Sequence, residues 1–275
     1  LGASVTAAAR LELRAPRLKG ADVFLDEPSV TATENALMAA VAAHGTTYLR
    51  NAASEPHVQD LANFLVALGA RIDGIGTNTM AVHGPATLGG VNYAIGPDHI
   101  EVGSLIGLAA VTRSQLRIAR AGVGHLRSIR MGFERLGISC EVEGDDLVVS
   151  DRQTLKIGDD FGGHVPKLED QPWPAFPADL MSIAIVTATQ CAGVVLMFEK
   201  MFESRMFFVD KLIAMGGRIV LCDPHRAIVA GPSQLKGALM SSPDIRAGMV
   251  MLRAAACAEG TSTMNTADQI ERGYE

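Results

Sequence analysis

Long hydrophobic runs and aromatic residues are what this sequence lacks most clearly. No apolar run reaches the ~18 residues that a membrane-spanning helix needs, and the first residues show no basic segment followed by an apolar one. These absences predict a soluble, cytoplasmic protein. Aromatic residues make up only 5% of the chain, against 48% hydrophobic residues. The core is therefore expected to consist of Ala, Val, Leu, Ile and Met, in thin layers of helix on sheet.

An excess of positive charge is lacking too. The formal net charge is -6, which argues against a nucleic-acid partner because binding to a phosphate backbone needs a basic face. A small anionic ligand remains compatible with this charge where positive groups gather locally.

Cysteine motifs and glycine-rich nucleotide fingerprints are absent as well. The four cysteines are far apart, lie among apolar neighbours and show neither C-x-x-C nor metal-ligand spacing, which predicts reduced, buried thiols and no metal site. The G-x-G fragments at 74–76 and 122–124 lack a following helix-opening glycine, so a dinucleotide site is not expected. The cysteines are Cys140, Cys191, Cys222 and Cys257.

What the sequence does contain is an internal repeat. A proline closely followed by Ser or Asp precedes an apolar helical run four times, at intervals of 65 to 81 residues. Each period also has a second helical pattern that ends at a glycine, the usual residue just past a helix end. The capping candidates are Ser29, Asp98, Asp179 and Asp244, and the stop glycines are Gly2, Gly69, Gly137 and Gly216.

The stretch 23–90 gives the template of one repeat. It predicts a strand at 23–25, a helix at 32–43, a strand at 46–50, a helix at 58–68 and a hairpin over 71–82, in the order β-α-β-α-β-β. The overlay puts first helices at 100–110, 180–189 and 245–258, second helices at 126–136 and 207–215, and strands at 116–119 and 194–198. Segment 151–177, which contains Trp173, is longer than the corresponding connection of the template. We interpret it as a functional loop that crosses a cleft.

Polar residues gather at two recurring places, the start of each first helix and each strand-to-helix turn. An aspartate at a helix start has an ordinary role as an N-cap, worth ~1 kcal/mol. An arginine at a turn can equally be a solvated surface residue. If they converge, Arg205, Arg246 and Arg272 would form a clamp for an oxyanion or a phosphate.

Five segments, in order and over nearly the whole chain, carry a family resemblance. They are similar to the UDP-N-acetylglucosamine 1-carboxyvinyltransferases, the enolpyruvyl transferases of peptidoglycan synthesis. The repeat count agrees with the plan of that family. The segments are 28–35, 176–179, 201–205, 242–246 and 270–275.

The resemblance implies a fold and a reaction. The fold is α/β (α+β), with two inside-out α/β barrel domains built from β-α-β-α-β-β units and the active site between them. Residues 1–95 are expected to form a partial first barrel, and residues 96–275 a second barrel that is incomplete at its C-terminus. The implied reaction transfers the enolpyruvyl group from phosphoenolpyruvate to the 3-hydroxyl of UDP-N-acetylglucosamine. No metal or organic cofactor is implied, nor is a membrane or nucleic-acid partner.

The resemblance also implies roles for particular residues. Asp179 corresponds to the carboxylate that accepts a proton from the sugar 3-hydroxyl, and Arg272 is the second catalytic candidate. Arg205, Arg246 and Arg272 match the arginines around phosphoenolpyruvate, oriented by Asp244. The nucleotide-binding loop corresponds to Glu27, Pro28, Ser29 and Val30, and further UDP-sugar contacts are expected from the turn with Met201 and Glu203.

The chain departs from the family pattern at several positions. Glu27 stands where many members have a basic residue, and Thr31 where they have a glycine. The family's Lys-Asn pair and its Gly-Gly-Cys loop with the proton-donating cysteine are not found in this chain, which predicts a catalytically incomplete portion of such an enzyme. Two alternatives are a non-catalytic UDP-sugar-binding or regulatory homologue and an enzyme of the 5-enolpyruvylshikimate-3-phosphate synthase type.

Overall fold

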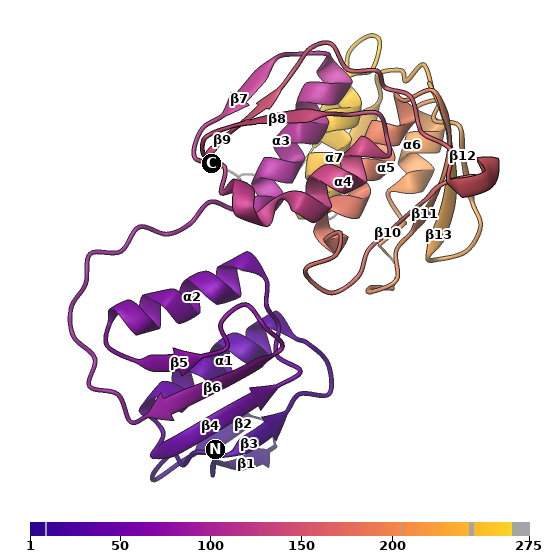
Figure 1. Ribbon diagram of the computed structural model, residues 1–275. Coiled ribbons are helices and arrows are strands. Elements are labelled where there is room, and N and C mark those ends of the chain that lie inside the picture. Colours follow the sequence, from indigo (N-terminus) through magenta and orange to yellow (C-terminus); the bar gives the residue numbers. More distant parts are fainter. Residues whose placement is uncertain (9, 204, 242–244, 266–275) are drawn as a thin grey trace. The chain divides into compact units, whose positions relative to one another are not determined.

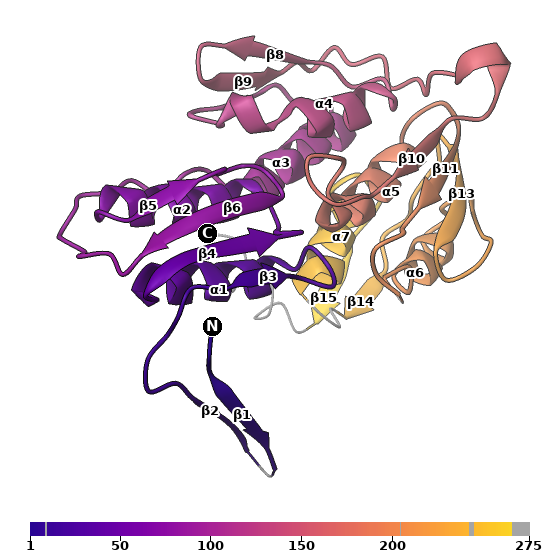
Figure 2. The same cartoon turned by 60° about the horizontal axis from the view of Figure 1, so that its bottom comes forward.

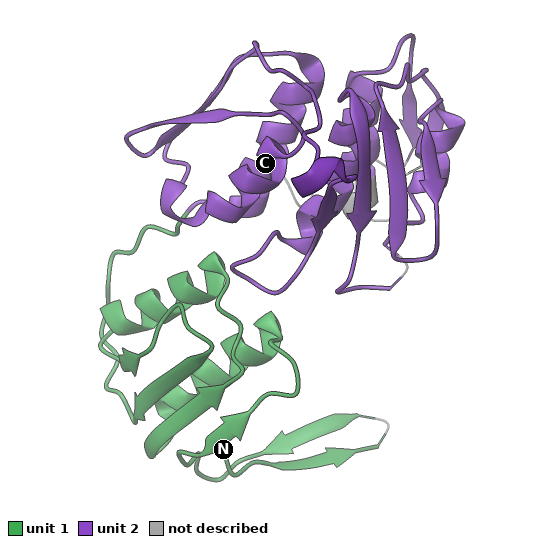
Figure 3. Ribbon diagram, turned by 45° about the vertical axis from the view of Figure 1, so that its right-hand side comes forward, with its two compact units in different colours: residues 1–96 green, residues 97–275 purple. Residues whose placement is uncertain are grey.

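The chain divides into two compact units, Leu1–Gly96 and Pro97–Glu275 (Figure 3). The computed structural model describes residues 1–8, 10–203, 205–241 and 245–265. Each unit contains its own cluster of buried hydrophobic side chains. Among the helices so described, none is long and apolar enough to cross a membrane.

The first unit is built on one β-α-β-α-β-β repeat, in the order predicted from 23–90. Strand β3 pairs in parallel with β4, and β4, β6 and β5 continue the sheet in antiparallel fashion. An exposed hairpin of β1 and β2 precedes the repeat and projects from the sheet of this unit (Figure 2). The elements are β1 (Ser4–Ala7), β2 (Leu11–Arg14), β3 (Asp22–Phe24), α1 (Val30–Ala42), β4 (Gly45–Arg50), α2 (Pro56–Ala67), β5 (Arg71–Asp73) and β6 (Thr79–Gly84).

The second unit continues the repeat (Figure 1). Its first part comprises α3 (His99–Thr112), β7 (Leu116–Ile118), η1 (Val123–His125), α4 (Arg127–Glu134), β8 (Cys140–Glu143) and β9 (Asp146–Val149). Then come η2 (Phe161–Gly163), β10 (Lys167–Glu169), η3 (Ala178–Leu180), α5 (Met181–Thr189), β11 (Gly193–Phe198), α6 (Val209–Ala214), β12 (Ile219–Leu221) and β13 (Arg226–Gly231). The last elements are β14 (Leu239–Ser241), α7 (Ile245–Ala256) and β15 (Thr263–Asn265).

The sheets repeat one topology with one exception. The order β10-β11-β13-β12 reproduces β3-β4-β6-β5, including the parallel first pair. The sheet β7-β9-β8 lacks the first strand, since 85–98 contributes none. That stretch is the connection between the units, and part of it is tied to α2: the Tyr93 hydroxyl donates to Asp60 Oδ1 at 2.8 Å and the Gly96 N–H donates to Asp60 Oδ2 at 3.3 Å.

Helices α3, α5 and α7 pack against one another in the centre of the second unit, between sheets β7-β9-β8 and β10-β11-β13-β12 (Figure 1). Two glycines on α3 permit this close approach. A Cβ on Gly107 would lie 2.6 Å from Ile183 Cγ2, and a Cβ on Gly103 only 2.4 Å from Leu180 Cδ1. The helices thus lie inside and the sheets outside, as an inside-out barrel requires.

Most of the stop glycines and capping residues of the repeat have the conformation or the contact that the sequence predicts. The stop glycines Gly2, Gly69, Gly137 and Gly216 have φ of 79°, 114°, 79° and 105°, the left-handed region that favours glycine. Ser29 caps α1 and Asp98 caps α3 through their side-chain oxygens. Asp179 differs, because it lies inside η3, whose capping position is held by Pro177.

The interpretation of 151–177 as a loop is wrong in part. The segment includes η2 and β10, and β10 pairs in parallel with β11 as the first strand of its repeat. Its three-residue strand is too short to give an alternating pattern in the sequence, so tertiary pairing alone defines it.

Candidate active site

The predicted nucleotide loop forms the N-terminus of α1. The Ser29 hydroxyl accepts a hydrogen bond from the Ala32 N–H at 3.3 Å, and the Ser29 N–H donates to the Glu27 carbonyl at 2.7 Å. Pro28, Ser29 and Val30 are partly exposed, and Glu27 is exposed. Backbone N–H groups at the start of a helix attract anions. The four residues therefore share one turn that can receive a phosphate group.

In the second unit, the structure brings two predicted site residues together. Arg205 Nη1 donates to Asp179 Oδ1 at 2.7 Å, although the two residues come from different turns of the chain. Their side chains are 22% and 34% exposed, so both remain reachable by a ligand. The pair thus places a carboxylate, which can accept a proton, beside a guanidinium, which can bind an anion.

The turn that follows β11 supplies the other predicted contacts. Met201 is 39% exposed, and Glu203 is exposed in the same turn. The Phe202 ring lies under Arg205, with its centroid 3.7 Å from the guanidinium carbon. This cation–π contact holds the arginine against the turn while its partner Asp179 fixes the other side.

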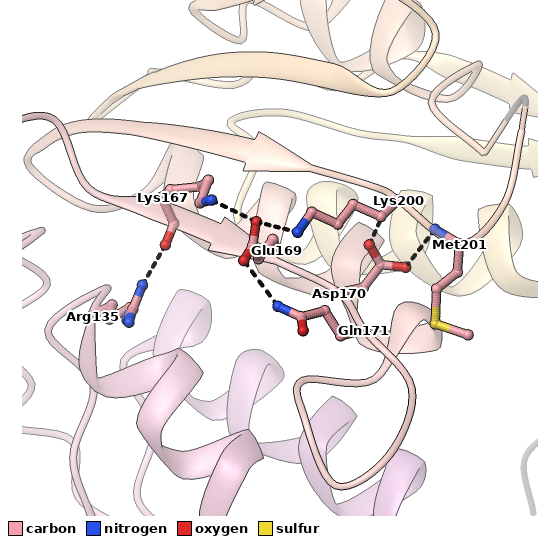
Figure 4. Close-up of polar contacts among 7 residues, drawn as sticks. All are labelled: Arg135, Lys167, Glu169, Asp170, Gln171, Lys200 and Met201. Atoms are coloured by element: carbon pink, nitrogen blue, oxygen red, sulfur yellow. Dashed lines mark hydrogen bonds and ion pairs between the residues drawn. The ribbon is translucent and has the colours of Figure 1, made fainter. Parts of the chain in front are cut away.

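Two acidic residues behind this turn are fully buried. Asp170 is 0% exposed and Glu199 is 1% exposed. The Lys200 N–H donates to Asp170 Oδ1 at 2.5 Å and the Met201 N–H donates to Asp170 Oδ2 at 3.2 Å (Figure 4). Burial, together with the hydrogen bond and charge of Asp170, raises the pKa of Glu199 to about 9. Burial beside Asp170 thus favours the protonated form of the Glu199 carboxyl.

A separate polar network lies beside these acids on β10. Glu169 Oε2 is 2.6 Å from Lys167 Nζ and 2.8 Å from Lys200 Nζ, and Gln171 donates to the other oxygen at 2.9 Å (Figure 4). Hydrogen bonds from the two lysines hold the pKa of Glu169 below its ordinary value. Arg135, the C-cap residue of α4, donates to the Lys167 carbonyl at 2.5 Å. These contacts attach β10 to both α4 and the turn after β11.

The single tryptophan contacts two histidines. The Trp173 ring meets His99 edge-on at 5.2 Å between centroids and lies 6.4 Å from His125. It also lines a groove of about 700 Å³ between α4 and the stretch 167–176, with Arg127 and Phe176 among the lining residues. His99 is 5% exposed and is thus a core residue at the start of α3.

Several predicted residues are not placed by the structure. Asp244 and Arg272 lie outside the described residues, and Arg246 belongs to α7, where its side chain is not described. The convergence of three arginines stays a prediction.

The sequence reasoning missed Asp170 and Glu199. Glu199 begins a turn already noted for its polar residues, and Asp170 directly follows a strand, but no pattern in the sequence shows that their side chains are buried together. Among the described residues, no three His, Cys, Asp or Glu side chains are grouped so as to hold a metal ion.

The expectation for the cysteines is wrong for one of them. All four are free thiols, Cys140 and Cys191 are buried and Cys257 is half-buried, but Cys222 is exposed. Cys222 directly follows β12. Val220 and Leu221, the last two residues of that strand, are also exposed, so apolar neighbours in the sequence did not indicate burial.

Comparisons with known proteins agree with this architecture. The chain is 85% identical over 275 residues to a UDP-N-acetylglucosamine 1-carboxyvinyltransferase of Bradyrhizobium diazoefficiens, covering 100% of this chain and 64% of that protein. A protein of the same name from Treponema denticola is 55% identical over 275 residues, with 100% and 65% covered. The chain thus spans less than two thirds of the length of these relatives.

A solved structure is similar as well. The enolpyruvyl transferase NikO from Streptomyces tendae superposes with a TM-score of 0.85 at 26% identity, covering 99% of this chain and 66% of that chain. This likeness confirms the predicted enolpyruvyl transferase fold. The model of one protein family matches residues 1–275 of this chain. On that match the chain belongs to the EPSP synthase (3-phosphoshikimate 1-carboxyvinyltransferase) family.

Proposed function

We propose that the protein carrying this chain transfers the enolpyruvyl group from phosphoenolpyruvate to the 3-hydroxyl of UDP-N-acetylglucosamine, in peptidoglycan precursor synthesis. The observation that carries this proposal is the Arg205–Asp179 ion pair at 2.7 Å. It joins the two positions at which the resemblance expects the proton acceptor and a phosphoenolpyruvate-binding arginine. The names of the similar Bradyrhizobium and Treponema proteins support the choice of substrates.

In this proposal Asp179 acts as the general base. It takes the proton of the sugar 3-hydroxyl while that oxygen bonds to C2 of phosphoenolpyruvate and C3 gains a proton. Loss of a C3 proton and of inorganic phosphate then leaves the enolpyruvyl ether. A positioned base contributes ~10²–10⁴-fold to such a step. Arg205, with Arg246 and Arg272, supplies positive charge for the carboxylate and the phosphate, and Asp244 orients these arginines.

The nucleotide end of the substrate is assigned to the first unit. Ser29 and the backbone N–H groups at the start of α1 are proposed to hold the diphosphate, with Pro28 and Val30 shaping the turn. Glu27 adds a negative charge here, so binding depends on the helix N-terminus and not on a basic side chain at this position. Met201 and Glu203 of the second unit are proposed as further contacts to the UDP-sugar.

The domain plan and the location of the protein follow from the same proposal. Residues 1–95 would belong to the barrel that contributes the nucleotide loop, and residues 96–275 to the barrel that contributes Asp179 and the arginines. We infer a cytoplasmic location because the proposed substrates are a nucleotide sugar and phosphoenolpyruvate.

Calorimetric titration of the 275-residue chain with UDP-N-acetylglucosamine and, separately, with shikimate 3-phosphate tests the substrate class. Binding of the uridine nucleotide alone is the expected result. Binding of shikimate 3-phosphate alone would move the chain to the shikimate branch. For the protein carrying this chain, phosphate release from phosphoenolpyruvate that depends on the UDP-sugar is expected, and binding without phosphate release would identify a non-catalytic homologue.

A further inference from the structure

The core of the second unit contains an arginine that the proposed reaction does not use. Arg253 of α7 is 3% exposed, and three of its neighbours in that helix, Val250, Met251 and Ala254, are 0% exposed. An arginine side chain stays protonated in proteins, and a buried charge is unfavourable unless polar groups compensate for it. The polar contacts of Arg253 therefore decide what this side chain does.

The guanidinium of Arg253 connects two helices of the core through backbone carbonyl groups. Its Nε donates to the Ser104 carbonyl of α3 at 3.2 Å, although 149 positions separate these residues in the sequence. Its Nη1 donates to the Met249 carbonyl of α7 at 3.1 Å. Because a guanidinium holds its N–H donors in a rigid, planar fork, the two bonds tie one level of α3 to one turn of α7.

The packing of the three central helices gives this contact its importance. Helix α3 fits α5 closely through a glycine, since a Cβ on Gly107 would lie 2.6 Å from Ile183 Cγ2. The other buried side chains described for α7 are apolar, and apolar burial is non-directional. A hydrogen bond, by contrast, requires a defined distance and angle. The bond from Arg253 to Ser104 thus selects one register of α7, meaning one rotation and one height of this helix relative to α3.

Helix α7 also carries one of the predicted substrate residues. It spans Ile245–Ala256, so Arg246 is its second residue and lies seven positions, or about 10 Å along the axis, before Arg253. The continuous backbone hydrogen bonds of a helix make its turns move together. Asp179 lies in η3, directly before α5. The register of α7 in this core therefore sets the distance between the backbone of its first turn and Asp179.

We propose that Arg253 is a positioning residue, which fixes the register of α7 against α3 and in this way places the first turn of α7, with Arg246, relative to Asp179. Arg253 is not a catalytic residue, because a side chain that is 3% exposed in the helix core is out of reach of a substrate. Its role in the register rests on the contacts of the structure alone. The effect on substrate binding rests in addition on the proposed function, in which Arg246 binds phosphoenolpyruvate.

Hydrogen exchange at the Arg253 side chain of the wild-type chain tests the bond to Ser104. The Nε–H of Arg226 is the internal reference, because it is also hydrogen-bonded, to Asp223 Oδ2 at 2.7 Å, but its side chain is 52% exposed. An Nε–H that is bonded inside the core should exchange at least ~100-fold more slowly than this reference, since exchange there requires the helices to separate. Equal exchange rates of the two groups would overturn the proposal.

The Arg253→Lys variant tests the register, because lysine keeps a positive charge on a long stem but loses the planar fork. In NMR spectra, the backbone amide signals of α7 should shift along the whole helix, including 245–247. Arg253→Met removes charge and donors together and should shift the same signals, which provides a second variant if the buried lysine prevents folding. Leu252→Met is the matched control, since Leu252 is 48% exposed on the same helix, and it should leave 245–247 unchanged. Unchanged signals of 245–247 in the folded Arg253 variants would contradict the proposal.

Phosphoenolpyruvate binding in a double-mutant cycle separates positioning from a general loss of structure. In the protein that carries this chain, with UDP-N-acetylglucosamine present, Arg246→Ala should weaken binding by about 10- to 100-fold through the loss of a charge-assisted contact. Arg253→Lys should weaken it by about 2- to 30-fold, the range for substitutions that act on a site from a distance. The double variant should bind no more weakly than Arg246→Ala alone, because Arg253 acts through Arg246. Losses that add in the double variant would count against the positioning role.

The same measurements separate the role of Arg253 from the proposed function. If the signals of 245–247 shift in Arg253→Lys and neither the wild type nor any variant binds phosphoenolpyruvate with UDP-N-acetylglucosamine, the register role stands and the proposed substrates are wrong. If the wild type binds both ligands and the Arg253 variants change neither these signals nor the affinity, the proposed function stands and the register role is wrong.

Discussion

Asp98 and Asp179 hold equivalent positions of the repeat but make different bonds. Asp98 caps α3 by accepting the Ile100 N–H at 2.7 Å, which is the ordinary role of an aspartate at a helix start. Asp179 lies within η3 and binds Arg205 instead. At this repeated helix-start position, Asp179 thus forms an ion pair where Asp98 forms a cap. Asp179 is therefore a better candidate for a catalytic role than Asp98.

Arg205 should contribute more to ligand binding than another arginine of the same unit that is also paired with an aspartate. Arg205→Ala removes a charge-assisted donor worth ~1.5–3 kcal/mol, so calorimetry should show phosphoenolpyruvate affinity reduced by ~10- to 100-fold. Arg226→Ala is the control, because Arg226 binds Asp223 at 2.6 Å with a 52% exposed side chain. Equal affinities for the two variants would remove Arg205 from the proposed site.

The four cysteines should differ sharply in reactivity. Burial raises the pKa of Cys140 and Cys257 to about 11 and that of Cys191 to about 12, and the thiolate is the reactive form. At pH 8, iodoacetamide followed by mass spectrometry should therefore label the exposed Cys222 first. The other three thiols should react fully only after denaturation. Early labelling of Cys191 would contradict the packing around α5.

At the scale of elements, α4 supports the segment that leads to Asp179. Gly132 of α4 faces the ring of Phe176, and a Cβ on Gly132 would lie 2.4 Å from Phe176 Cδ2. Phe176 is only 5% exposed and also contacts Phe133, so the ring has little room to move. Helix α4 can thus approach the segment 176–179 this closely only because the residue at position 132 is a glycine.

Gly132→Ala should therefore disturb both stability and the Asp179 segment. Overpacking in a filled core costs ~1–3 kcal/mol, which thermal unfolding should detect as a lower midpoint. The NMR signals of 176–180 should shift as well. Gly124→Ala is the matched control, because no atom lies within 4 Å of its added Cβ. If both variants unfold at the wild-type temperature, the close contact at Gly132 is not a constraint.

The elements show how far the sequence could predict the fold. The first helices at 100–110 and 180–189 correspond to α3 (His99–Thr112) and α5 (Met181–Thr189), because proline, capping residue and apolar run act locally. β10 was missed because three residues carry no periodicity, and its strand pairing comes from β11, distant in sequence. Before α3, the stretch 85–98 contains no strand, so the second repeat departs from the template there.

The residues of the candidate site also differ in whether the sequence could predict them. Residues marked by motifs, such as Ser29, Asp179 and Arg205, could be named from the sequence through family resemblance. The burial of Asp170 and Glu199 could not, because the two acids follow β10 and β11 and become buried only when these distant strands pair. That burial exists only after the sheet has formed.

At the scale of the whole molecule, the two units have separate hydrophobic cores. Leu37, Leu49 and Val82 belong to the cluster of the first unit, whereas Ile106 and Phe133 belong to that of the second. No residue that the structure describes is shared between the clusters. Because hydrophobic burial is the main stabilising term in folding, each unit should carry most of its own stability.

A core substitution in one unit should therefore leave the other unit unaffected. Leu37 is 0% exposed, and Leu37→Ala should cost about 2–5 kcal/mol through lost burial and the cavity left behind. Native-state hydrogen exchange should show this loss across α1, β4 and β6, while protection in α3 and α5 stays at the wild-type level. The neighbouring Met38 on the same helix is 47% exposed, so Met38→Ala should change neither unit by more than ~0.5 kcal/mol. An equal loss of protection in both units after Leu37→Ala would mean that they unfold as one cooperative body, and the separation of the cores would then have no energetic consequence.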